Sequence, residues 1–262
     1  MPLTLTPLIG IPLIRHGDNL AEIVLKALSS NNISLQDNDV LVFAQKIVSK
    51  AEGRTVDLTT VVPSPRAIEL AKHTEKDHRI VELILQESKE VLRTRIGAII
   101  VEHKLGFVCA NAGIDHSNVN PPLPLGEASG VMPEDWVLLL PAEPDKSAER
   151  MRAEIQSKSG RKVGILIIDS HGRAWRNGTV GVAIGIAGIP GLEDLRGKPD
   201  LFGYKLQVTQ VGVADELAAA ASLVMGQAAE GMPVVHVRGF PYPLREASLK
   251  ELIRPKEQDL FR

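Results

Sequence analysis

The pattern of apolar positions is clearest in the stretch of residues 163–191. Residues 163–168 form an apolar run rich in β-branched side chains, and Asp169 and Ser170 end it. Such a run predicts a fully buried strand, so we expect Asp169 and Ser170 at the strand end, where sites commonly open. A second apolar segment follows, and glycines punctuate it at Gly178, Gly181, Gly185 and Gly188.

The rest of the chain mixes helical and strand patterns. Apolar periodicity predicts helices over residues 20–28, 65–74, 78–91, 147–157 and 215–225, with Asp18, Ser64, Asp77, Asp145 and Asp215 as N-caps. Further strands are predicted at residues 3–9, 40–44, 96–101, 105–109, 136–140, 205–213 and 233–237, and a short helix at 247–253. These elements do not alternate as successive βαβ units would. We therefore predict an α+β fold, with mixed β-sheets and flanking helices.

Composition narrows the class of protein. The 262 residues suffice for one large domain or two intimate lobes, and the net charge of −2 gives no electrostatic case for nucleic acid. No apolar stretch has the length and composition of a membrane span, and no secretory signal is indicated. The single cysteine, Cys109, lies in an apolar stretch and is expected in the core. We expect a cytoplasmic protein.

Two polar clusters carry the candidate chemistry. Asp169 and Ser170 are followed by Arg173 and Arg176, and residues 111–120 hold Asp115, Ser117 and Asn118. Carboxylate, hydroxyl and amide oxygens suit Mg²⁺ or Mn²⁺, and the arginines suit phosphate. Each cluster alone has a structural alternative, an Asx-rich turn or a helix cap. Lys46 and Lys50, just past the 40–44 strand, fit either a solvated surface or a phosphate site.

Seven short blocks resemble, in order, the coenzyme F420-0:γ-glutamyl ligase family. They are GIPL (10–13), VSKAEG (48–53), NAGIDHSN (111–118), DSHGRAWR (169–176), ADEL (214–217), LVMGQ (223–227) and VHVRG (235–239). The resemblance implies that family's fold, an intertwined homodimer, and a domain over residues 1–239 with a tail over 240–262. It also implies GTP-dependent addition of L-glutamate to coenzyme F420-0, followed by γ-linked extension.

The resemblance also implies roles for individual residues. The metal, Mn²⁺ or Mg²⁺ with K⁺ as a further ion, would be held by Asp115, Asp169, Ser170 and Gln227. Asp115, Asp169 and Lys50 would be catalytic. Nucleotide contacts would come from Ile9, Gly10, Ile11, Pro12, Gln45, Lys46, Lys50, Asn118, Met225, Gly226, Gln227, Ala228, Ala229, Glu230, Gly231 and Met232.

Three departures from the family pattern stand out. Ala228-Ala229 replaces residues that are often glycine or acidic, residues 120–133 look like an insertion, and only a short tail follows Gly239. Without the resemblance, the residues fit a ligase and a metal-dependent nucleotide or phosphoester phosphohydrolase equally well. A non-catalytic nucleotide- or flavin-binding module is a third possibility. The resemblance favours the ligase, which needs no nucleophilic side chain because GTP would activate the carboxyl as an acyl phosphate.

Overall fold

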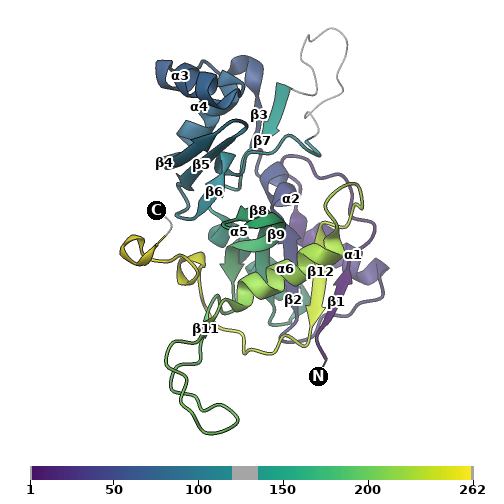
Figure 1. Ribbon diagram of the computed structural model, residues 1–262. Helices are drawn as coiled ribbons and strands as arrows, with labels where there is room; N and C mark the ends of the chain where they lie inside the picture. The colour runs from purple at the N-terminus through teal and green to yellow at the C-terminus, as the bar shows by residue number, and fades with distance from the viewer. Residues whose placement is uncertain (1, 120–134, 261–262) are drawn as a thin grey trace.

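A five-stranded mixed sheet forms the body of the protein. The computed structural model describes residues 2–119 and 135–260. The strand order is β1 (Thr4–Pro7), β12 (Val234–Arg238), β2 (Val40–Ala44), β8 (Gly164–Arg173) and β9 (Arg176–Ala187). Only β2 and β8 are parallel, and the other pairs are antiparallel. The strand arrangement is shown in Figure 1.

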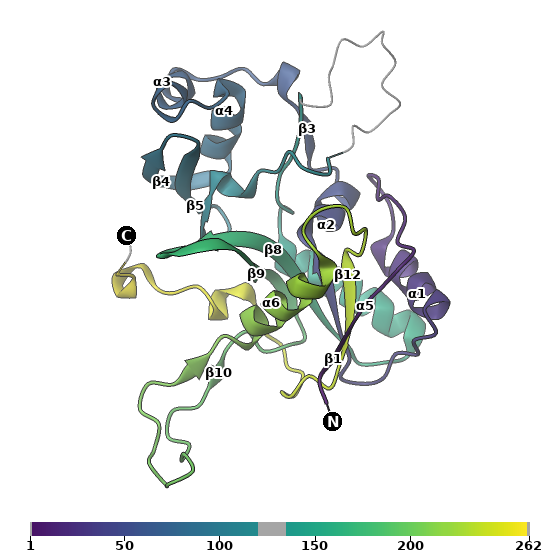
Figure 2. The same ribbon diagram turned by 45° about the vertical axis from the view of Figure 1, so that its right-hand side comes forward.

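Helices cover both faces of this sheet. α1 (Leu20–Ser30) and α5 (Pro144–Ser159) pack with one set of alternating strand residues, and α6 (Val213–Met225) packs with the other. The two layers are visible on opposite sides of the sheet in Figure 2. Because both faces are buried, the central strands β2 and β8 need apolar residues at successive positions, which accounts for the uninterrupted runs in the sequence.

A small lobe, built from residues 55–119 and 135–138, lies above the body in Figure 1. It contains the sheet β4 (Ser88–Arg95), β5 (Ala98–His103) and β6 (Val108–Ala110), and the pair β3 (Thr55–Asp57) and β7 (Trp136–Leu138). Its helices are η1 (Leu58–Thr60), α3 (Pro65–Thr74), α4 (His78–Gln86) and η2 (Asn111–Gly113). Its core includes Val81, Ile84, Val101 and Cys109.

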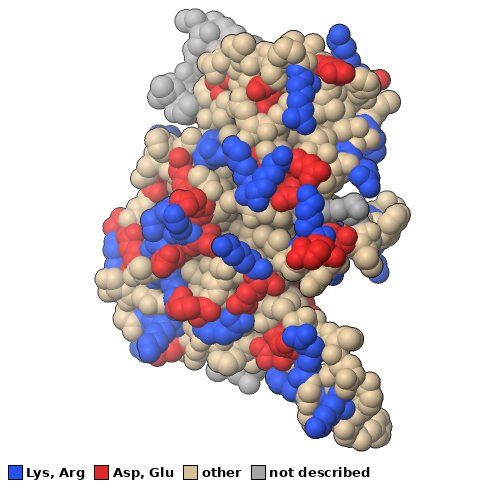
Figure 3. Space-filling view, turned by 90° about the vertical axis from the view of Figure 1, so that its left-hand side faces the viewer, with Lys and Arg blue, Asp and Glu red and all other residues tan. Residues whose placement is uncertain are grey.

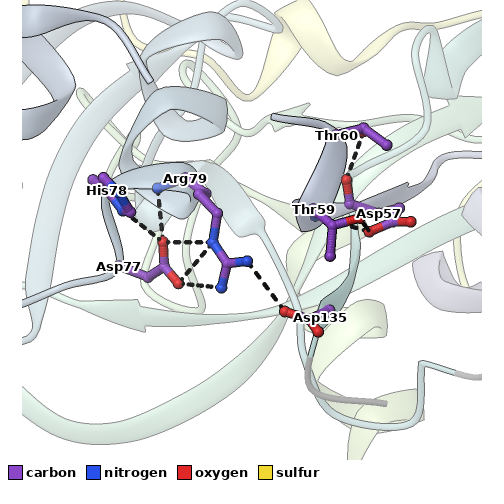
Figure 4. Close-up of polar contacts among 7 residues, drawn as sticks. All are labelled: Asp57, Thr59, Thr60, Asp77, His78, Arg79 and Asp135. Atoms are coloured by element: carbon purple, nitrogen blue, oxygen red, sulfur yellow. Dashed lines mark hydrogen bonds and ion pairs between the residues drawn. The ribbon is translucent and has the colours of Figure 1, made fainter. Parts of the chain in front are cut away.

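Aspartates fix the local geometry of this lobe (Figure 4). The Asp77 carboxylate accepts a hydrogen bond from the backbone N–H of Arg79 and forms an ion pair with the Arg79 guanidinium. The same guanidinium lies 3.2 Å from Asp135 Oδ1. The start of α4 is thereby joined to the residue just before β7. Asp57 accepts the backbone N–H of Thr59 and so caps η1.

An arm and a tail complete the chain. The arm leaves the body through β10 (Glu193–Asp194) and β11 (Gln210–Val211), and Figure 3 shows it projecting below a face on which acidic and basic side chains are interspersed. The tail contains η4 (Leu249–Glu251) and η5 (Lys256–Gln258). Lys256 Nζ pairs with Glu90 Oε2 of the small lobe at 2.7 Å, so the tail reaches from the body to that lobe.

The predicted α+β class is confirmed, as are most elements. The strand 40–44 and the helix from Pro65 to Thr74 have their predicted bounds, and Ser64 and Asp77 are N-caps as predicted. The strands around His103 and Lys104 do pair as an antiparallel hairpin. None of the described helices is long and apolar enough to cross a membrane. The insertion predicted at residues 120–133 lies outside the described residues, and the division into a domain and a tail stays a prediction.

Three predicted N-caps are wrong. Asn19, not Asp18, caps α1 by accepting the N–H of Glu22, whereas Asp18 accepts the N–H of Arg15. Asp145 and Asp215 lie inside the first turns of α5 and α6, and their carboxylates accept backbone N–H groups of β9. An N-cap aspartate and an aspartate in the first helical turn cannot be distinguished in the sequence. Here Asp145 and Asp215 form hydrogen bonds to β9, which is distant along the chain, and do not cap their helices.

Several element boundaries are also wrong. Asp169 is inside β8, because the strand continues through polar residues to Arg173 as part of a long hairpin. Val91 belongs to β4 and not to a helix that ends at Gln86. Of the strand predicted at 205–213, only Gln210–Val211 forms, and the helix predicted at 247–253 is a single 3₁₀ turn.

Candidate functional site

A pocket of about 410 Å³ opens where β2 ends and β12 begins. Five segments distant in sequence meet there: residues 11–14, the β2–α2 junction, the segment after η2 at Asn118, the middle of β8, and the end of α6 with the loop that follows it. The lining residues are Ile11, Pro12, Leu13, Ile14, Ala44, Gln45, Lys46, Ile47, Lys50, Asn118, Ile168, Asp169, Ser170, Ser222, Met225, Gly226, Gln227, Ala228, Ala229, Glu230, Gly231, Met232 and Pro233.

The junction of β2 and α2 supplies the cations. The buried strand β2 ends at Ala44, and α2 (Gln45–Ala51) starts at once, a helix that the sequence analysis did not predict. Lys46 and Lys50 are one helical turn apart and therefore share a face. Both Nζ atoms contact the segment after η2: Lys46 reaches Ser117, and Lys50 donates to the carbonyl of Asn118 at 2.6 Å.

Asp115 lies against this junction without itself lining the pocket. Its backbone pairs with Leu138, and its Oδ2 accepts from Gln45 Nε2 at 2.7 Å and from Lys46 Nζ at 2.8 Å. Ser49 donates to Gln45 Oε1, so the amide nitrogen of Gln45 is the atom that faces Asp115. The carboxylate is thus held from the small-lobe side against two pocket residues.

The hairpin of β8 and β9 supplies Asp169 and Ser170. Asp169 Oδ2 lies 3.0 Å from His171 Nε2 on the same strand face. On the opposite face, Ser170 donates to Gln227 Oε1, and Gln227 Nε2 donates to Ser222 of α6. α6 can approach this closely because Gly181, opposite Ser170, has no side chain; a Cβ there would lie 2.4 Å from the carbonyl oxygen of Ala218.

Asp115 and Asp169 are close enough to influence one another. Burial raises the pKa of Asp115 above 3.8; the Lys46 ammonium opposes that shift, and the charge of Asp169 adds to it. Burial lowers the pKa of Lys50, and the neighbouring Lys46 charge lowers it further. The site therefore contains a partly buried carboxylate, Asp115, and a partly buried ammonium, Lys50. The surrounding protein does not fully stabilise the charged form of either group.

These residues fit a divalent cation. The oxygen donors are the carboxylates of Asp115 and Asp169, the Ser170 hydroxyl and the Gln227 amide oxygen. The pKa of Asp115 is raised by burial and, to a smaller extent, by the charge of Asp169, and a bound cation would favour the ionised carboxylate. Within residues 2–119 and 135–260, no group of three histidine, cysteine, aspartate or glutamate residues could hold a metal alone. Such a donor set suits Mg²⁺ or Mn²⁺, which retain waters and bind substrate phosphates, better than it suits Zn²⁺.

Most of the residues implied as nucleotide contacts line the same pocket. Ile9 and Gly10 are the exceptions: both are exposed, and Ile9 is tied to Asn31 through two hydrogen bonds beside the pocket. Asn118 bridges two of the segments by donating to the carbonyl of Ala228. The roles of all these residues stay predictions.

The structure also corrects the sequence analysis on the arginines and adds residues that it missed. Arg173 and Arg176 lie at the tip of the hairpin and do not line the pocket. Ser49, Ser222 and His171 support the site residues and were not predicted. Ser222 lies one turn before Gly226, the glycine that ends α6. A serine at that spacing from a helix-ending glycine was the available sequence signal that its hydroxyl lies near the loop after the helix.

The comparison with family models decides the family. The model of F420-0:Gamma-glutamyl ligase matches residues 8–239, which is most of the chain. The chain belongs to this family. Curated relatives match this chain of the F420-0:γ-glutamyl ligase family over nearly its whole length.

Three such relatives are each named "Coenzyme F420:L-glutamate ligase". The protein of Methanothermobacter thermautotrophicus is 45% identical over 264 residues, with 100% of both chains covered. That of Methanocaldococcus jannaschii is 43% identical, covering 96% of this chain and 94% of its own. That of Methanopyrus kandleri is 42% identical, covering 95% and 93%. The resemblance read from the seven short blocks is thereby confirmed.

Proposed function

We propose that this chain is a GTP-dependent ligase that joins L-glutamate to coenzyme F420-0 and extends the product through γ-links. The names of the curated relatives support the acceptor and the amino acid. The observation that carries the proposal is that Asp169, Lys46 and Lys50 line one pocket, while Asp115, from a distant segment, is held against its wall by Gln45 and Lys46.

The chemistry explains why such a site needs both signs of charge. A carboxylate reacts poorly with an amine, since an oxide would have to leave. An oxygen of the acceptor carboxylate would first attack the γ-phosphorus of GTP, releasing GDP and forming an acyl phosphate. The amine of glutamate would then attack the acyl carbon, releasing phosphate and losing a proton.

The chain's own residues would offset the repulsion between the anionic carboxylate and the anionic triphosphate. Lys46 and Lys50 place ammonium groups at the pocket wall, and the lowered pKa of Lys50 shows that its charge is incompletely solvated. A Mn²⁺ or Mg²⁺ ion, with K⁺ as a further ion, would stabilise the charge that develops during phosphoryl transfer. Asp115, Asp169, Ser170 and Gln227 would hold and orient that ion.

The loop of residues 225–232 is proposed as the guanine-nucleotide side of the pocket. Its Gly226 has φ +77°, and its backbone is turned so that Glu230 accepts the N–H of Ala228. The segment that begins at Ile11 also lines the pocket. The Ala228-Ala229 pair adds no side-chain hydrogen-bond donor to the pocket, so a base there would be contacted mainly by backbone groups.

One assay tests the ligase proposal against its alternatives. The protein is incubated with F420-0, GTP, L-glutamate and Mn²⁺, and the deazaflavin products are read by mass spectrometry. Stepwise glutamyl additions with equal GDP release are expected. Phosphate release that does not depend on glutamate, without glutamyl products, would identify a phosphohydrolase instead. GTP binding without turnover would identify a binding module.

An intertwined homodimer is also proposed, and the arm supports it. Leu201 and Phe202 at the arm are 97% and 95% exposed, and Tyr204 and Val208 are exposed beside them. Apolar groups gathered on a projecting segment are unusual for a monomer. Light scattering after size exclusion should give a dimer mass for wild type and a monomer mass for the double variant Leu201→Ser/Phe202→Ser. A monomeric wild type would contradict the proposal.

A further inference from the structure

Two histidine–aspartate contacts lie at the five-stranded sheet, and they differ in what else the carboxylate binds. At the end remote from the pocket, Arg238 donates to both oxygens of Asp39, and His236 Nε2 lies 2.8 Å from Oδ2. At the pocket, His171 Nε2 lies 3.0 Å from Asp169 Oδ2. Among the described residues, no group donates to Oδ1 of Asp169, so this carboxylate has one oxygen left for a ligand.

Asp115, the other proposed metal-binding carboxylate, has the same one-sided arrangement. Gln45 and Lys46 both contact its Oδ2, at 2.7 and 2.8 Å, and Oδ1 receives no hydrogen bond from the part of the chain that the structure describes. Asp115 and Asp169 are thus each anchored through one carboxylate oxygen, whereas Asp39 uses both. A carboxylate anchored in this way has a fixed orientation and one oxygen with which to bind a cation.

The strand geometry of β8 brings His171 to Asp169. The two residues are two positions apart in the strand, so their side chains lie on the same face of the sheet. The side chains of His171 and Asp169 are only 12% and 11% exposed, so water cannot readily replace the imidazole as the donor. An acceptor at so buried a position costs free energy when it loses its donor, and the fold therefore maintains this contact.

Phe107 holds the imidazole ring of His171 from the side of the small lobe, where β6 contacts β8 (Figure 1). The centroids of these two rings are 5.3 Å apart, and the rings are tilted by 50°. Phe107 is itself stacked on His103, with the centroids 5.3 Å apart, and it packs against the apolar cores of both lobes. The orientation of the imidazole is therefore limited by packing as well as by its hydrogen bond to Asp169.

We propose that His171 is a positioning residue for the metal ligand Asp169. By donating to Oδ2, it fixes the carboxylate so that Oδ1 binds the divalent cation. Its role is that of a hydrogen-bond donor and not of a metal ligand, because Nε2 already donates to Asp169. Hydrogen-bond partners of this kind orient the groups that bind a metal. This inference rests on the proposed function, because that function supplies the cation.

Binding of Mn²⁺ alone to the metal-free protein tests this role, through the electron paramagnetic resonance signal of the unbound ion. His171→Phe keeps a ring against Phe107 but lacks the donor, and His171→Leu lacks both; each should weaken Mn²⁺ binding by on the order of 10- to 100-fold. His171→Gln supplies an amide N–H at a similar reach and should restore most of the affinity. The matched control is His236→Phe at the other contact, which should lower the unfolding temperature and leave Mn²⁺ affinity unchanged.

A spectroscopic signature separates a positioning residue from a ligand. The electron spin echo of Mn²⁺ bound to wild type should lack the modulation that a directly coordinated imidazole nitrogen produces. Such modulation, if it disappeared in His171→Phe, would make His171 a ligand and overturn the proposal. Wild-type Mn²⁺ affinity in the folded donor-free variants, with folding checked by circular dichroism, would overturn it too. Equal losses of affinity in His171→Phe and His171→Gln would likewise show that the donor is not what matters.

The outcomes separate the role of His171 from the function on which it rests. Wild-type protein whose Mn²⁺ affinity depends on His171 but that adds no glutamate to F420-0 would contradict the ligase and leave the positioning role intact. Wild-type protein that ligates normally, while His171→Phe keeps wild-type Mn²⁺ affinity, would leave the ligase intact and overturn the positioning role. Wild-type protein that binds no Mn²⁺ would overturn both the metal site and this role.

Discussion

Asp39 is fully buried and Asp115 is partly buried, and the protein treats their charges in opposite ways. Asp39 lies before β2, at the end of the sheet remote from the pocket, and receives hydrogen bonds from His236, Arg238 and the backbone N–H of Gln36. Burial alone would raise the pKa of Asp39, but these bonds hold that pKa well below its ordinary value. Burial raises the pKa of Asp115, and its partners do not reverse the shift.

The difference is between a carboxylate whose charge the fold compensates fully and one whose charge it compensates only in part. The fold surrounds Asp39 with enough donors to stabilise its ionised form. At Asp115 the donors Gln45 and Lys46 balance only part of the charge, with Asp169 nearby. Incomplete compensation of a buried carboxylate is expected where a substrate or ion completes the charge balance.

The largest effect should come from removing one of the proposed metal-binding carboxylates. Asp169→Asn should fold but lose ligation by on the order of 10²-fold or more, because a group that stabilises charge in the transition state is lost. Steady-state turnover with F420-0, GTP and glutamate measures the loss. Circular dichroism provides the control for folding. Near-normal turnover would remove Asp169 from the catalytic site.

Asp39→Asn should reduce stability and leave turnover nearly unchanged. It should lower the free energy of unfolding by about 2 kcal/mol, since Arg238 and His236 lose their buried partner, while turnover per folded molecule stays within about twofold. Urea unfolding followed by circular dichroism measures the first quantity. Loss of turnover without loss of stability would contradict the structural assignment of Asp39.

The contribution of Asp39 to stability should depend on pH. The folded-state pKa of Asp39 is depressed, so its contribution is present above the ordinary aspartate value of 3.8 and is lost as pH falls through the depressed value. The stability gap between wild type and Asp39→Asn should therefore be widest near neutral pH and shrink below about pH 4. A gap that stays constant to pH 2 would show that Asp39 acts by packing alone.

The smallest effect is expected at Asp115 in metal-free protein. Its folded-state pKa is raised, so the ionised carboxylate costs stability above that pKa, and Asp115→Asn should slightly raise the unfolding temperature at pH 7. Saturating Mn²⁺ should raise the unfolding temperature of wild type more than that of the variant, because a ligand stabilises the state that binds it. Equal shifts in both proteins would place the ion elsewhere.

The sequence alone singles out the candidate ligands Asp115 and Asp169 but not the structural carboxylate Asp39. Asp115 and Asp169 stand in clusters of oxygen donors, which is a local signal. The buried bond between Asp39 and His236 joins residues 197 positions apart and depends on the register of β12 beside β2, which no local pattern contains. Candidate metal ligands can therefore be proposed from a local cluster of oxygen donors. Hydrogen-bond partners that lie far apart in the sequence can be identified only from the folded structure.

The elements that were missed have physical reasons as well. β4 is an edge strand with a mostly exposed, charged sequence, so it shows little apolar alternation. α2 begins directly after a strand and has no side-chain cap, the signal by which a helix start is usually found. The arm folds through turns around Asp200 and Gly203 and not through the long strand that its apolar residues suggested.

Cys109 gives the small lobe a built-in chemical reporter. It is the only thiol in the chain, it lies in the core of that lobe, and burial raises its pKa to about 12. A thiol reagent should therefore modify the native protein only when the lobe opens, so the modification rate measures that opening without any engineered label. Modification as fast as that of a free thiol would mean that the lobe is open most of the time.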